Sequence, residues 1–161
     1  MTTTATSTQL NHHEQRVAVH LVQGVHPAYI GRQVYRSPHT ILTVMGAMRV
    51  KLGCPPGAAR HVLVHTLLTS DAHQFTPPAK EGREPALTLD QLTLLRTLTQ
   101  YSRLRDVAQS LGVTQNALRR RINALHAMAR TKDLSNLIIW GHTWGLLDTG
   151  PDVTDAEEVS L

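Results

Sequence analysis

The sequence predicts an all-α fold made of two tandem four-helix modules. Apolar residues recur at the three- and four-residue spacing of helices, and typical helix-capping residues precede most of these runs. No segment of useful length alternates apolar and polar residues as a strand would. A shift of 77 positions lays the apolar pattern on itself without a gap, which indicates two copies of one module. The superimposed pairs are Leu10 and Leu87, Val17 and Leu94, Leu21 and Leu98, Ile30 and Val107, Ile41 and Leu118, and Met45 and Ile122.

The repeat divides the chain into five segments. The modules cover residues 10–70 and 87–147, and a proline-rich linker covers 71–86. Residues 1–9 are expected to be a disordered N-terminus, and residues 148–161 form an acidic tail. Proline and glycine disfavour regular structure, so the linker should be an extended connection, long enough for the modules to pack together or to stay apart.

Each module should contain four short helices. In the first module the signals are the capping box of Asn11 with Glu14, Pro27 at a helix start, Ser37 before Pro38 as an N-cap, and the Gly-Cys-Pro-Pro break at 53–56 before a helix to about Leu68. In the second they are the capping box of Thr88 with Gln91, a helix from near Ser102 to Gly112, Thr114 as an N-cap, and Asp133 before a helix that stops at Gly145.

The charge of the chain is unevenly distributed. The formal net charge is +4, yet residues 10–70 and 87–147 each carry +5, whereas the linker carries −1 and the tail −5. Two basic blocks favour a polyanionic partner, although cations also serve simply to keep small helical domains in solution. The tail either competes weakly with phosphates for the basic module or only aids solubility.

Several classes of protein are excluded or disfavoured by composition. No stretch approaches the roughly 18 apolar residues of a membrane span, and the N-terminus lacks the features of a signal peptide. The expected location is therefore the cytoplasm, with no membrane partner. A single cysteine, Cys54, rules out an intrachain disulfide and a multi-cysteine zinc site.

No catalytic or cofactor site is expected. The sequence contains no glycine-rich phosphate loop, paired catalytic carboxylates or nucleophile with a base, so we predict neither an enzyme nor a cofactor. His61 and His65 stand four apart on a predicted helix and could face one metal ion, but no third ligand is visible. Surface or half-buried histidines are therefore expected there, and no metal.

The second module contains the spacing of a helix-turn-helix motif. A short helix ends at Gly112-Val113-Thr114 and a longer helix follows, with Leu118, Ile122 and Leu125 as its buried stripe. Such a turn sets the longer helix at an angle that lets its exposed N-terminal half enter a DNA major groove.

Both modules resemble the LuxR-type (GerE-like) helix-turn-helix domain of bacterial transcription regulators, over about three quarters of the chain. The second module carries the resemblance in LTLDQLTLLRTLTQYSRLRDVAQSLGVTQNALRRRINAL and a closing Gly145-Leu146-Leu147. The first matches the family pattern at Leu10, Glu14, Val17, Leu21, Gly24, Ile30, Ser37, Pro38, Thr40, Ile41, Lys51, Leu52 and Gly53. The resemblance implies binding to double-stranded DNA, and hence association with the nucleoid in the bacterial cytoplasm.

The resemblance also assigns roles to particular residues. The positions similar to the family's base readers are Arg119, Arg120 and Asn123, whose side chains suit guanine and adenine edges. The same positions in the first module are Leu42, Thr43 and Gly46, and Arg36 replaces a residue that the family usually buries. The first module is therefore expected to serve packing or partner contact. The other expected DNA contacts in the second module are Thr114, Gln115, Asn116, Arg105 and Arg121.

The fourth helix of such domains is commonly the dimer contact. The resemblance thus implies a homodimer, or a pseudo-dimer within one chain, through Leu134, Leu137, Ile138 and Trp144, with Leu42 as a further partner contact. A second hypothesis is an adaptor that modulates RNA polymerase or another regulator, with DNA contact secondary. A third, a module like region four of a sigma factor, lacks room for the promoter-binding region that normally accompanies it.

Overall fold

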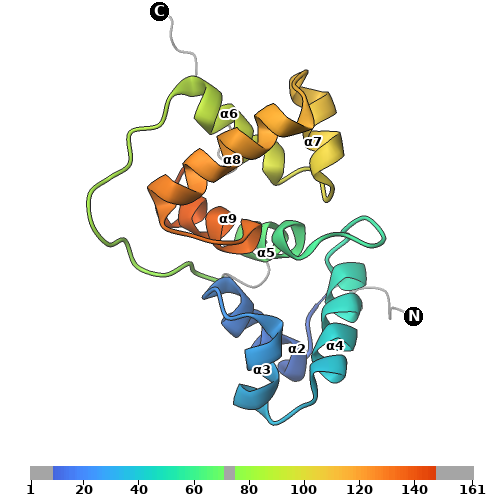
Figure 1. Ribbon diagram of the computed structural model, residues 1–161. Coiled ribbons are helices and arrows are strands. Elements are labelled where there is room, and N and C mark those ends of the chain that lie inside the picture. The colour runs from blue at the N-terminus through green and yellow to red at the C-terminus, as the bar shows by residue number, and fades with distance from the viewer. Residues whose placement is uncertain (1–8, 71–74, 148–161) are drawn as a thin grey trace, which may run out of the picture.

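The computed structural model describes residues 9–70 and 75–147, which form eight α-helices and no β-strand (Figure 1). The predicted all-α class is confirmed for this part of the chain. Residues 1–8 of the expected disordered N-terminus and the acidic tail 148–161 lie outside the described residues. The helices are α2 (His12–Val22), α3 (Pro27–Val34), α4 (Pro38–Lys51), α5 (Arg60–Thr69), α6 (Leu89–Leu98), α7 (Leu104–Leu111), α8 (Gln115–Ala129) and α9 (Leu134–Thr143).

The capping residues expected from the sequence hold the helix starts. The Asn11 side chain accepts a hydrogen bond from the Glu14 N–H at 2.8 Å, and the Glu14 carboxylate accepts one from the Asn11 N–H at 2.9 Å. Thr88 and Gln91 form the same reciprocal pair at the start of α6. These bonds satisfy amides that have no acceptor within the helix. The other predicted N-caps that accept a backbone N–H are Ser37, Thr114 and Asp133.

The offset of the sequence repeat holds for three helices and changes at the fourth. Helices α6, α7 and α8 begin where that offset places them relative to α2, α3 and α4, whereas α9 begins three positions earlier than its counterpart α5 requires. Residues 52–59 connect α4 to α5, and the shorter segment 130–133 connects α8 to α9. The longer connection contains the Gly-Cys-Pro-Pro segment, so the chain reaches α5 by a wider turn than α9.

The helices enclose two hydrophobic cores. One lies among α2 to α5 and contains Ile41 and Met45, and the other lies among α6 to α9 and contains Leu118 and Leu125. Ile139 crosses this division, since it belongs to α9 but is buried in the first core, with 4% of its surface exposed. We call α2–α5 and α6–α9 the first and second halves of the molecule.

Helices α5 and α9 join the two halves. They lie side by side at the centre of the molecule (Figure 1), and each contacts the other more extensively than any helix of its own half. Residues 75–86 of the linker follow one side of the molecule (Figure 1), where the Thr143 hydroxyl donates to the Pro78 carbonyl at 3.2 Å and the Gln23 side chain donates to the Thr76 carbonyl at 3.3 Å. Of the two arrangements that the linker allows, the chain adopts the packed one.

None of the helices in the described ranges is long and apolar enough to cross a membrane. The longest there, α8, has 15 residues, against about 20 for a typical span.

Candidate nucleic-acid interface

The segment expected to contact DNA forms a tight corner between α7 and α8. Gly112 ends α7 in the left-handed conformation, with φ of 69°, and its N–H donates to the Ala108 carbonyl. A Cβ at Gly112 would meet no atom within 4 Å, so the positive φ is what favours glycine there. The Val113 N–H also donates to Ala108, at 3.0 Å, and Thr114 then caps α8 by accepting the Ala117 N–H at 3.1 Å.

The buried face of this corner fixes its orientation. Val107 of α7 and the expected stripe of α8, Leu118, Ile122 and Leu125, are all buried in the second core. Because the apolar side of α8 is held against α6, α7 and α9, its opposite side faces away from the protein.

That opposite side carries the residues expected to read bases. At about 100° of rotation per residue, Asn116, Arg120 and Asn123 fall opposite the buried stripe, and Arg119 falls about a quarter turn from it, at the edge of the same exposed face. All four are exposed. Arg121 is also exposed, but falls on the flank between the two faces. The surface therefore presents two planar guanidinium groups and two amides on successive turns of one helix.

The start of α8 adds further hydrogen-bonding groups to this surface. Thr114 and Gln115 are exposed, as is Arg105 in the first turn of α7. The Thr114 hydroxyl oxygen accepts a backbone N–H, which leaves its own proton available to an outside acceptor. First-turn amides such as those of Gln115 and Asn116 have no acceptor within the helix.

The positive charge of this surface is not neutralised by the described part of the chain. The ion pairs found there involve other cations, Lys51 and Arg60. Arg119, Arg120 and Arg121 form no ion pair with any described residue. Their guanidinium groups are therefore available to an anionic or hydrogen-bond-accepting partner.

The corresponding face of α4 has different chemistry. Leu42, the counterpart of Arg119 in the repeat, is 57% exposed. The Thr43 hydroxyl donates to the His39 carbonyl of its own helix at 3.1 Å, and Gly46 is half-buried without a side chain. Arg36, just before the Ser37 cap, is exposed. No charged side chain thus stands at the three α4 positions that match the α8 readers.

Most residues expected to contact a partner chain are packed inside this one. Leu137 and Ile138 are fully buried in the second core, and Leu134 is half-buried against it. Trp144 is half-buried, with the Lys80 ammonium 5.7 Å from its ring centroid. Within the expected set Leu42 is the exposed member. The physical reason is that α9 lies against α5 of the same chain and sends its apolar side chains into cores of this chain.

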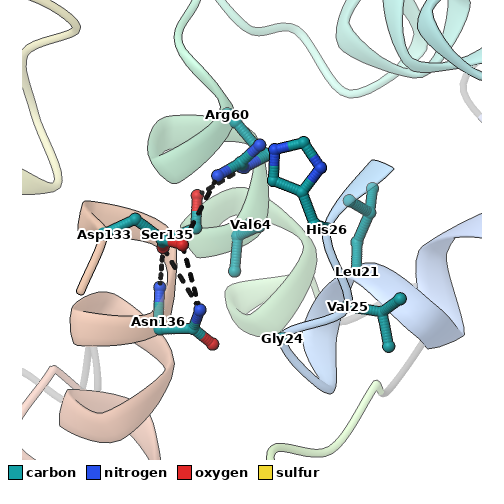
Figure 2. A pocket seen from close by; sticks show the side chains of 9 residues that line it. All are labelled: Leu21, Gly24, Val25, His26, Arg60, Val64, Asp133, Ser135 and Asn136. Carbon is teal, nitrogen blue, oxygen red and sulfur yellow. Dashed lines mark hydrogen bonds and ion pairs between the residues drawn. The ribbon is translucent and has the colours of Figure 1, made fainter. Parts of the chain in front are cut away.

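The contact between α5 and α9 contains a cluster of polar residues, of which the sequence motifs identified only Asp133, as a helix cap. The Arg60 Nε donates to the Ser135 hydroxyl at 3.0 Å, and the Arg60 guanidinium lies 3.7 Å from the Asp133 carboxylate (Figure 2). Asp133 also caps α9 by accepting the Asn136 N–H at 2.8 Å. These four residues border a cavity of about 10 Å³, room for about one water molecule.

Equivalent turns of the two halves pack on the fourth helix of the other half. Gly24, in the turn after α2, lies against Asn136 of α9, and a Cβ on Gly24 would collide with the Asn136 side-chain amide. Tyr101 is the counterpart of Gly24 in the turn after α6, and its carbonyl accepts a hydrogen bond from His61 of α5 at 2.9 Å. The contact between the halves is therefore reciprocal.

Three histidines lie in this contact. His61 and His142 are buried, and the half-buried His65 places its Nδ1 2.8 Å from the Nε2 of His142. The expectation of a surface or half-buried residue is wrong for His61, because α9 and the turn after α6 cover it. His65 and His142 are 77 residues apart, the offset of the sequence repeat, and this spacing could have singled out the pair in the sequence even though α5 and α9 themselves are offset by three positions less. No group of three or more metal-binding side chains gathers in the described part of the chain.

No family model matches this chain, and neither a characterised protein nor a solved structure matches it. The geometry and chemistry of the α7–α8 corner are therefore the features of this chain that indicate a function.

Proposed function

We propose that this protein is a sequence-specific DNA-binding transcription regulator, of the LuxR-type helix-turn-helix class that its sequence resembles. The observation that supports the proposal is the exposed row of Arg119, Arg120 and Asn123, which lies away from the buried stripe of α8 in the helix that follows the left-handed corner at Gly112. The buried stripe fixes the orientation of the helix. The exposed guanidinium and amide groups can then form paired hydrogen bonds in a DNA major groove.

The side chains in this row match the chemistry of base edges. An arginine can donate two hydrogen bonds to O6 and N7 of guanine, and an asparagine can pair with N6 and N7 of adenine. In this proposal Arg119, Arg120 and Asn123 read bases, while Arg105 and Arg121 contact phosphates. The Thr114 hydroxyl and the first-turn amides of α8 also bind the backbone, which positions the reading helix without selecting a sequence.

The first half acts as a packing and partner module in this proposal. Its α4 offers Leu42 and Thr43 where α8 offers two arginines, so it adds little base-specific hydrogen bonding. Because α5 and α9 hold the halves together within one chain, we infer an intrachain pseudo-dimer that binds one DNA site asymmetrically, with α8 as the reader.

Selection of bound sites from random duplex DNA by the intact protein tests the proposal. Enrichment of a short common sequence, followed by binding of that duplex well above a scrambled duplex of equal length, is the expected result. Enrichment of no sequence, with equal binding of both duplexes at all salt concentrations, would reject a sequence-specific regulator.

The adaptor hypothesis remains the second candidate, and the exposure of Leu42 on α4 favours it. An adaptor that contacts RNA polymerase or another regulator would bind through such an apolar surface. It would tolerate loss of Arg119 and Arg120, so the arginine variants described below separate the two functions.

A further inference from the structure

The His65–His142 pair has a hydrogen-bonding pattern that depends on protonation. His65 Nδ1 and His142 Nε2 lie 2.8 Å apart, and the two rings have centroids 5.0 Å apart with a tilt of 36°. In the neutral pair one nitrogen carries a proton and donates it to the lone pair of the other. When both rings are protonated, both nitrogens carry a proton and no lone pair is left to accept. The doubly charged pair therefore cannot keep this contact.

Singly protonated rings are also disfavoured in this contact, because burial penalises the charge. Burial lowers the pKa of His65. Burial and, secondarily, the charge of His65 lower the pKa of His142 from the ordinary 6.5 to about 4. Both shifts favour the neutral imidazoles in the packed form.

The charged groups around the pair do not offset this penalty. Asp133 is the carboxylate of the α5–α9 contact, but it precedes His142 by nine residues, about 13 Å along the helix axis, and pairs with Arg60. Glu14 of α2 pairs with Lys51. The remaining charged and titratable groups of the segments packed on α5 and α9 include His12, His13, Arg16, His20, His26, Cys54, Arg60, His61, Lys80, Asp90, Arg96, Tyr101, Arg119, Arg120, Arg121 and His126.

His61, the third histidine of the contact, behaves differently. Its Nε2 donates to the Tyr101 carbonyl, and a protonated ring would still donate there. Burial lowers the pKa of His61, whereas backbone hydrogen bonds to Tyr101 and Leu98 act in the opposite direction. The sensitivity to protonation is thus greatest at the His65–His142 pair.

We propose that the His65–His142 pair makes the α5–α9 contact a pH-sensitive joint, whose protonation separates the two halves of the molecule. Each half keeps most of its own core, and what the separation breaks is the reciprocal contact and the insertion of Ile139 into the first core. The inference does not depend on DNA binding.

The direction of the effect follows from the lowered pKa of both rings. The separated form binds protons more readily, so the packed form is fully favoured above pH 6.5 and loses stability as the pH falls from 6.5 toward 4. With a pKa of about 4 for His142 in the packed form, lowering the pH from 7.5 to 5.0 should raise the separation constant about 30-fold.

The distance between the halves tests the proposal directly. Gln33→Cys on α3 and Ser110→Cys on α7 provide two exposed labelling sites, one on each half, in a Cys54→Ala background. Spin-label distances at pH 7.5 and 5.0 are compared at low and high salt, because salt screens repulsion between exposed histidines but not within a buried pair. At pH 7.5 we expect one narrowly distributed distance, and at pH 5.0 a growing population of longer distances at both salt concentrations.

Two control proteins distinguish protonation of the His65–His142 pair from other effects of low pH on the structure. His65→Asn and His142→Gln together keep polar nitrogens near the two positions but cannot titrate, and should keep the single narrowly distributed distance at both pH values. His12→Gln removes an exposed histidine and should behave as the parent does. An unchanged distance in the parent, or the same lengthening in the double variant, would overturn the proposal.

A measurement on the parent keeps the proposal testable if the double variant does not fold. Histidine ring resonances followed by NMR should show His142 titrating well below pH 6.5 while the halves are packed. Titration of His142 at or above pH 6.5 would contradict the proposal.

Discussion

At the scale of single residues, the exposed side chains of α8 carry the strongest prediction. Arg119→Ala or Arg120→Ala should cost about 1–3 kcal/mol on the selected duplex and relax preference at one or two bases, because a bidentate contact to a base edge is lost. Leu42→Ala and Thr43→Ala, the matched changes on α4, should leave base preference nearly unchanged. Binding curves on selected and scrambled duplexes measure both.

The outcome that contradicts the assignment is equally specific. If residues 1–76 alone select the same sequence as the intact chain, and the double variant of Arg119 and Arg120 binds normally, then α8 is not the reader.

Phosphate contacts should respond differently from base contacts. Arg105→Ala or Arg121→Ala should weaken selected and scrambled duplexes alike, because phosphates are the same in every sequence. Each variant should also reduce the slope of log affinity against log salt by about one unit, since one fewer counterion is released. Titrations at several salt concentrations give the slope, and a change of base preference in either variant would instead place that arginine among the readers.

At the scale of elements, the corner after α3 and the corner after α7 each contain one residue in the left-handed conformation, Tyr35 and Gly112 respectively. Gly112 adopts it without strain, whereas Tyr35 adopts it at φ 59° with a side chain that is 87% exposed. Tyr35→Gly should therefore stabilise the protein by about 1 kcal/mol, because little packing is lost and a steric cost is removed. Gly112→Ala should destabilise it by a similar amount. Urea unfolding measures both, and a loss of stability in Tyr35→Gly would contradict this account of the corner.

The elements of the candidate site were predictable because their signals are local. A capping residue acts on an amide two or three residues away, and a buried stripe repeats within a single helix. Thr114, Gly112 and the stripe at Leu118 and Ile122 therefore placed α8, and the positions opposite the stripe followed from helix geometry.

The fourth helices were less predictable because they are apolar on more than one side. In α9 Leu137 and Ile138 turn into the second core, while the next residue, Ile139, enters the first. A sequence with three successive apolar residues does not say which faces its own half and which faces another surface. The resemblance left open whether a second chain or the other module covers this surface, and here α5 of the same chain occupies it.

At the scale of the whole molecule, the pairing of α5 with α9 predicts a monomer. Each of these helices already covers the face through which the other could bind a second chain. Sedimentation at concentrations that saturate DNA should give the 17.8 kDa monomer, and one chain should bind per selected duplex. A stable dimer of free chains, or two chains on one duplex, would contradict the intrachain pseudo-dimer.

The sequence by itself determined the helices and their capped starts. It also determined the repeat that relates α2, α3 and α4 to α6, α7 and α8, and the exposed arginine row on α8. The helices, caps and arginine row depend on residues within a few positions of one another, and the repeat is a comparison of such local patterns. Only the tertiary structure decided that α5 packs on α9, that Arg60 reaches Asp133 and Ser135, and that His65 meets His142. Those contacts join residues from opposite halves of the chain, and they exist because the linker allows the two halves to pack and the shorter turn before α9 sets which of its side chains face α5.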